Sequence, residues 1–172
     1  MKFNTLNRSV VWAVAALALS LPGLVHSAAL TDYAENKAID AILRGQTLGA
    51  PVTGYAALYT TCPTDSTAGT EVTGGSYARV AITSSLANWA GTQSAGSTTA
   101  SSGTGGTTSN NGVITFPAPT ANWGVVTCWG ILDASTAGNL WIYSALTTNK
   151  TVNNGDAAPS FAAGAATFQI DN

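Results

Sequence analysis

The fold of this chain is decided by residues 125–146, which read VVTCWGIL, DASTAGN and LWIYSAL in succession. Residues 125–132 form a continuous apolar run, which is typical of a strand that is buried on both faces. Residues 133–139 are rich in Asp, Ser, Gly and Asn, which favour turns. Residues 140–146 are again apolar and aromatic, so the whole stretch predicts a β-hairpin built on a central strand.

Further strands are expected on both sides of this hairpin, each bounded by proline or by Gly- and Asn-rich turns. They cover residues 55–61, 76–84, 113–116 and 166–170. Six or seven short strands at this spacing are typical of a sandwich or barrel. We therefore expect a mainly β protein, an antiparallel β-sandwich that forms a single domain over residues 30–172.

One short amphipathic helix is expected before the strands. Asp32 is placed to cap its start, and Glu35 three residues later completes a capping-box pattern. Gly45 is expected to end the helix. Its apolar side chains fall on one helical stripe. They are Tyr33, Ala38, Ile39, Ile42 and Leu43.

One segment departs from the strand-and-turn pattern. Residues 90–112 contain only Ala, Gly, Thr, Ser, Gln and Asn. Loops of this length are uncommon in compact domains, and such a composition cannot build a core of its own. We interpret it as a Ser/Thr/Gly-rich insertion, either a surface excursion or a segment that orders against a neighbouring subunit. Trp89 and Trp123 flank it and are candidate interface residues, with core packing as the alternative for each.

Residues 1–29 have the features of a targeting segment. Lys2 and Arg8 precede an apolar run at 10–21, and small residues follow at 27–29, which is the order found in a secretory signal peptide. The run is shorter than the roughly 20 residues that a membrane-spanning helix needs. The alternative is an uncleaved apolar helix that anchors the chain to a membrane or a partner, and membrane contact would then involve residues 10–21.

The two cysteines, Cys62 and Cys128, favour one disulfide. An even cysteine count is typical of exported chains that form disulfides. Each cysteine lies at or beside an expected strand, which allows the short separation that a bridge needs. The alternative is a pair of buried thiols that pack as small apolar groups.

Composition excludes several classes of function. Charged residues make up 8% of the 172 residues and the net charge is −2, so no basic surface for nucleic acid is expected. The single histidine is His26, inside the targeting segment, so the rest of the chain has no imidazole for nucleophilic catalysis or a zinc site. Helix capping and turns account for most of the carboxylates. We therefore expect no enzyme activity, no cofactor and no metal site.

Several separated segments carry a resemblance to a known family. They are LTDYAENK at 30–37, GTEVTGGSYAR at 69–79, FP at 116–117, NWGVVT at 122–127, GILDA at 130–134, GNL at 138–140, ALTT at 145–148 and NGD at 154–156. In this order they resemble a family of small bacteriophage virion proteins, the tail-fibre or tail-fibre-like proteins. The resemblance spans nearly all of residues 30–171.

The resemblance implies a structural virion protein, a tail fibre or a capsid or tail decoration subunit, that acts through self-assembly and surface contacts. It implies no cofactor and no catalytic residues. The expected partners are further copies of the chain or other virion subunits, with a host-surface glycan as an additional candidate. The targeting segment and the cysteine pair favour an alternative, an exported subunit of a bacterial cell-surface filament or adhesive layer. A second alternative is a carbohydrate-binding module, since exposed aromatic rings stack on sugars. The expected location is therefore the virion or the cell surface.

Overall fold

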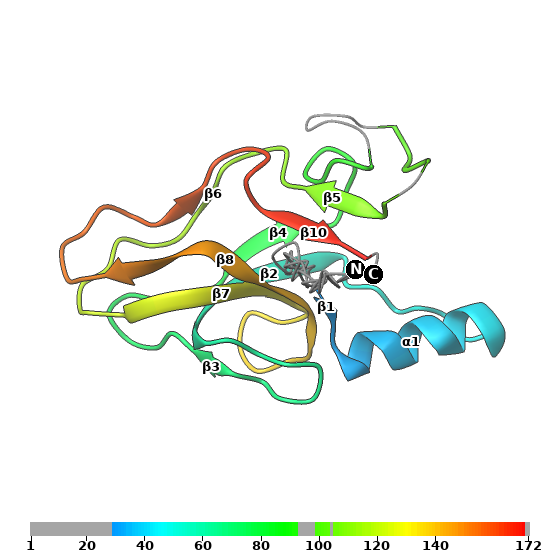
Figure 1. Cartoon of the computed structure of the whole chain (residues 1–172), viewed down its shortest axis with the longest axis horizontal. Coiled ribbons are helices and arrows are strands. Elements are labelled where there is room, and N and C mark those ends of the chain that lie inside the picture. Colours follow the sequence, from blue (N-terminus) through cyan, green and yellow to red (C-terminus); the bar gives the residue numbers. More distant parts are fainter. Residues whose placement is uncertain (1–28, 93–98, 104, 171–172) are drawn as a thin grey trace, which may run out of the picture.

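The computed structural model of the protein describes residues 29–92, 99–103 and 105–170. The signal-peptide or anchor prediction covers residues 1–29, of which all but Ala29 lie outside the described residues. The described part contains one helix and antiparallel strands, all of which except a two-residue first strand follow the helix (Figure 1). The predicted mainly β, antiparallel architecture is confirmed.

Ten strands are present among the described residues, where six or seven were expected. In chain order the elements are β1 (Ala29–Leu30), α1 (Asp32–Leu43), β2 (Thr53–Thr61), β3 (Thr70–Glu71), β4 (Val80–Thr83), β5 (Thr107–Ser109), β6 (Ile114–Thr115), β7 (Gly124–Leu132), β8 (Leu140–Val152), β9 (Ser160–Phe161) and β10 (Thr167–Gln169). The additional strands β1, β3, β5 and β9 have two or three residues each. Strands this short carry no readable alternation of apolar and polar residues.

The largest sheet has the strand order β1-β8-β7-β2-β3, and β4 also pairs with β2. β7 lies in its centre, between β8 and β2, as the apolar run predicts. Gly130 of β7 allows a close approach to β8, because a Cβ at this position would lie 2.8 Å from the backbone oxygen of Ile142. The three strands β8, β7 and β2 therefore form the centre of the main sheet.

Two small ribbons, β5–β10 and β6–β9, form a second layer over this sheet. Trp129 of β7 lies at the centre of the core between the layers. Its ring centroid is 4.1 Å from that of Phe168 on β10 and 4.9 Å from that of Phe161 on β9. One aromatic side chain of the sheet thus contacts both ribbons.

The described part of the insertion at 90–112 contributes to the second layer. β5 lies inside it and pairs with β10. Asn110 is 1% exposed, and its Nδ2 donates to the backbone oxygens of Gly112 and Ala162 at 2.7 and 2.8 Å. Its Oδ1 accepts a hydrogen bond from the Ala166 backbone N–H at 2.8 Å. Residues 107–110 therefore order against the chain's own second layer.

The helix cap differs from the one expected. Thr31, not Asp32, is the N-cap residue of α1, and its Oγ1 accepts from the Ala34 backbone N–H at 3.4 Å. The same hydroxyl donates to the backbone oxygen of Leu140 on β8 at 2.5 Å. A hydroxyl can accept and donate at once, whereas a carboxylate only accepts. The expected cap at Asp32 is therefore wrong, and Asp32 is the first residue of the helix.

No helix among the described residues reaches the length and hydropathy of a membrane span.

Candidate functional site

The acidic side chains occupy structural positions. Glu71 pairs with Arg79 at 2.7 Å, Asp65 accepts a hydrogen bond from the Tyr143 hydroxyl at 2.8 Å, and Asp133 binds the turn between β7 and β8. In the described ranges, no three or more His, Cys, Asp or Glu side chains are grouped so that they could hold a metal ion. The expectation that the chain is not an enzyme stays a prediction.

A hydrogen-bonded network around Tyr77 closes a gap in the edge of the main sheet. Leu58 of β2 lies between the residues that pair with β4 and those that pair with β3. Its backbone N–H donates to the Tyr77 hydroxyl oxygen at 2.9 Å, and that hydroxyl donates to Glu71 Oε1 at 2.9 Å. Arg79 donates two hydrogen bonds to Glu71, at 2.8 and 2.7 Å, and two to backbone oxygens of the β7–β8 turn.

The pKa values of three side chains in and beside this network are raised above their ordinary values. Burial raises the pKa of the Tyr77 hydroxyl, and burial also raises the pKa of the nearby Tyr59 to about 12. The hydrogen bonds to Glu71 raise the pKa of Arg79. A general acid or base works best with a pKa close to the operating pH. All three shifts are upward and take the pKa values further from neutral pH.

Tyr77→Phe is expected to lower the free energy of unfolding by about 1–3 kcal/mol, because the Leu58 N–H would lose its partner in a half-buried place. Chemical denaturation of both proteins measures this change. Tyr143→Phe is the matched control, because it removes an exposed hydroxyl–carboxylate bond. An equal loss in both variants would contradict the role assigned to Tyr77.

Asp133 organises the turn between β7 and β8. Its carboxylate accepts from the Asn139 backbone N–H at 2.7 Å, from Asn139 Nδ2 at 2.9 Å and from the Trp141 indole N–H at 3.3 Å. Partial burial raises the pKa of Asp133, but these hydrogen bonds outweigh it and lower the pKa below its ordinary value of 3.8. The turn is therefore most stable with Asp133 ionised.

The stabilisation by Asp133 is expected to be complete above its unfolded-state pKa of about 4 and to disappear as the pH falls through the lower folded-state pKa. The difference in free energy of unfolding between the wild type and Asp133→Asn should therefore shrink on acidification. Denaturant titrations at a series of pH values between about 6 and 2 measure it. Glu35→Gln, which removes one exposed helical charge, is the control. A difference that stays constant over this range would contradict the prediction.

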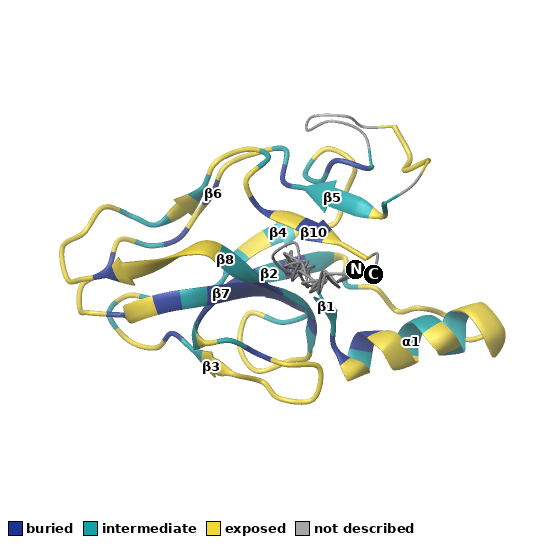
Figure 2. Cartoon of the chain, viewed as in Figure 1, coloured by how far each residue is buried: buried dark blue, intermediate teal, exposed yellow. Residues whose placement is uncertain are grey.

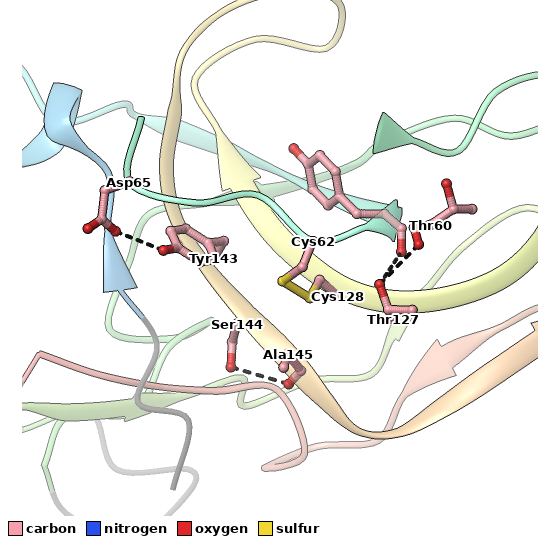
Figure 3. Close-up of a disulfide and its surroundings, with 9 residues drawn as sticks. Thr60, Cys62, Asp65, Thr127, Cys128, Tyr143, Ser144 and Ala145 are labelled. Atoms are coloured by element: carbon pink, nitrogen blue, oxygen red, sulfur yellow. Dashed lines mark hydrogen bonds between the residues drawn. A yellow bond between two sulfur atoms is a disulfide. The ribbon is translucent and has the colours of Figure 1, made fainter. Parts of the chain in front are cut away.

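The predicted pairing of Cys62 and Cys128 is present as a disulfide, with a Cα–Cα distance of 5.2 Å (Figure 3). It joins the residue that follows β2 to the middle of β7. Cys128 is 1% exposed. Beside it, Thr127 Oγ1 lies 3.2 Å from the backbone oxygen of Thr60, to which it donates. Covalent and hydrogen bonds thus hold the end of β2 on the central strand.

The two candidate interface tryptophans lie in different surroundings. Trp123 is 5% exposed, its indole N–H donates to the Gly75 backbone oxygen at 3.0 Å, and its ring meets that of Tyr77 edge-on with a centroid distance of 5.3 Å. These contacts favour core packing for Trp123. Trp89 is half-buried, packs against the core and also lines an apolar groove. Of the two, Trp89 is the stronger interface candidate.

The groove lies between α1, the main sheet and the β5–β10 ribbon, and its volume is about 330 Å³. It is lined by Leu30, Ala34, Ala38, Leu48, Ala50, Pro51, Gly54, Ser84, Trp89, Thr108, Ile131, Trp141, Ile142, Phe168 and Ile170. No lining side chain carries a charge. The groove is therefore suited to an apolar occupant and not to an ion or a sugar.

The second half of α1 adds further exposed apolar side chains to this end of the molecule. Ile39, Ile42 and Leu43 are 53%, 77% and 78% exposed, although they belong to the predicted apolar stripe. Only Ala34 of the helix is buried. Figure 2 shows exposed and half-buried residues alternating along the helix, with a buried part near its start. Large exposed apolar patches on a protein surface mark interaction sites, so this end of the molecule is the candidate functional site.

The site combines predicted and unpredicted residues. The helical stripe could be recognised from its spacing, and Trp89 from its position beside the insertion. The groove could not, because its walls come from segments more than 100 residues apart, such as Leu30 and Ile142.

Comparisons with known proteins identify the family. A family model described as podophage GP4 fiber I protein gp80 matches residues 29–169. A comparison with curated proteins finds no match. The matched range contains the helix, all ten strands and both cysteines, which confirms the resemblance to bacteriophage fibre proteins and indicates a component of the virion. The chain therefore belongs to the family of podophage GP4 fiber I proteins.

Proposed function

We propose that this chain is a tail-fibre or decoration subunit of a phage particle that acts through self-assembly and surface contacts, without catalysis. The observation that carries the proposal is the exposed apolar end formed by α1 and the groove. Exposed apolar surface costs free energy in water, and burial against another subunit removes that cost. Family membership supports the same role, since a fibre subunit associates with other virion subunits.

The carbohydrate-binding alternative has less support among the described residues. Three of the tryptophans there, Trp123, Trp129 and Trp141, are at most 9% exposed, so their rings are not available to stack on a sugar. Trp89 is half-buried in the groove wall. A host-surface glycan stays a candidate partner that these tryptophans do not favour.

The experiment that tests the proposal is quantitative mass spectrometry of purified phage particles, together with antibody labelling and electron microscopy. We expect the chain at a constant ratio to the major capsid protein and label at one location on the particle. Intact mass under non-reducing conditions reports in addition whether residues 1–29 are retained and whether the disulfide is formed. Absence of the chain from particles, with recovery in the cell-surface fraction, would contradict the proposal.

A further inference from the structure

The arrangement of α1 is unusual for a helix on the surface of a β protein. Its small apolar residues, Ala34 and Ala38, face the chain's own groove, whereas its large ones, Ile42 and Leu43, are more than three-quarters exposed. In a helix that packs only on its own domain, the large apolar residues normally face inward. The large apolar residues in the second half of α1 are therefore available for contact with something outside the chain.

The groove beside α1 has the complementary property. A cavity of about 150 Å³ accommodates a benzene molecule, so the groove's 330 Å³ has room for two or three aliphatic side chains. Leu48 and Ile170, on its lining, are 41% and 63% exposed. The chain thus presents an apolar projection, formed by the exposed side chains of Ile39, Ile42 and Leu43, at the same end as an apolar recess, the groove.

We infer that the occupant of the groove is a second copy of this chain, whose α1 inserts Ile39, Ile42 and Leu43. This inference rests on the proposed function and identifies the subunit that contacts this site as a second copy of the chain. A copy supplies the projection and the recess in equal number, so a closed assembly covers both on every subunit. The uncharged lining opposes a charged partner, which would lose its hydration without a compensating ion pair.

Two variants test the two sides of this interface separately. Replacement of Ile39, Ile42 and Leu43 by Ser removes the projection, and Ala50→Trp, at an exposed position on the lining, fills the recess. Val125→Ser is the matched control, because Val125 is 47% exposed on β7. It lies six residues from the groove residue Ile131, about 20 Å along the strand.

Sedimentation velocity of the full-length protein over a range of concentrations is the measurement. We expect the wild type and Val125→Ser to self-associate, and each of the other two variants to raise the dissociation constant by about tenfold or more. A mixture of those two variants should recover part of the association, because one supplies an intact helix and the other an intact groove. Circular dichroism checks that each variant is folded.

A monomeric wild type would overturn the inference. So would association that neither variant weakens, or that only the helix variant weakens, since the groove would then not be the acceptor. If the inference fails while the chain is still found in purified particles, the proposed role as a virion subunit stands without self-assembly through this site, and another virion subunit covers it. Absence from particles would refute the proposed function whatever the state of association.

Discussion

Asn110→Ala is expected to lower the free energy of unfolding by about 3 kcal/mol, because three hydrogen bonds disappear from a buried place. The truncation leaves the backbone oxygens of Gly112 and Ala162 and the N–H of Ala166 without the amide that binds them. These groups belong to the end of the insertion and to the segment before β10. Urea denaturation monitored by tryptophan fluorescence measures the loss.

Two further variants serve as comparisons for this prediction. Asn110→Asp keeps the shape of the side chain but turns an acceptor toward two carbonyl oxygens, so it should destabilise at least as much as Asn110→Ala. Asn149→Ala, at an exposed position on β8, should change the free energy of unfolding by less than about 0.5 kcal/mol. If Asn110→Ala behaved like Asn149→Ala, the segment around residue 110 would not belong to the cooperative fold.

Removal of the disulfide is expected to lower the free energy of unfolding by about 4 kcal/mol, because the bridge restricts a long loop in the unfolded chain. The sequence separation of Cys62 and Cys128 is 66 residues. The comparison is between the oxidised wild type and the Cys62→Ala/Cys128→Ala variant in chemical denaturation without reductant.

The reduced wild type is the control for packing, because it retains both sulfur atoms. It should lie close to the double variant in stability, and any remaining difference reports the cavity left by the buried Cys128 side chain. Equal stability of the oxidised and reduced wild type would show that the loop constraint contributes nothing.

The hairpin shows how far a hydrophobic pattern predicts strands. The first strand was expected at 125–132 and is found at Gly124–Leu132. The second was expected to stop at 146 but continues to Val152, pairing Val125 with Thr151 and Val126 with Lys150. Residues 147–151 are exposed, so no burial pattern marks them, although the backbone ladder continues. A sequence pattern reports which side chains are buried, not where backbone pairing ends.

The strand expected at 76–84 was too long for a different reason. Only Val80–Thr83 form β4. Ser76 has a positive φ of 64°, and Tyr77 uses its side chain rather than its backbone to bind Leu58 of β2. A side-chain bond between residues 19 positions apart leaves no periodic trace in the sequence.

The candidate site was predicted only in part for a similar reason. The spacing of apolar residues marks the stripe on α1, but spacing alone does not tell which part of a stripe faces the chain's own sheet. In the structure Ala34 and Ala38 line the groove, whereas Ile39, Ile42 and Leu43, later in the helix, are exposed. That division depends on how closely the helix approaches the sheet, which is a property of the assembled layers.

The disulfide also determines how the subunit responds to a mechanical load. Tension applied between a point before Cys62 and a point after Cys128 passes directly across the sulfur–sulfur bond. Every residue from 63 to 127 is bypassed by that force, including β3, β4, β5 and β6. These four strands therefore lie off the covalent path of the pull, whereas the ribbon partners β9 and β10, which follow Cys128, lie outside the loop. The covalent chain can lengthen only through the segments outside the loop.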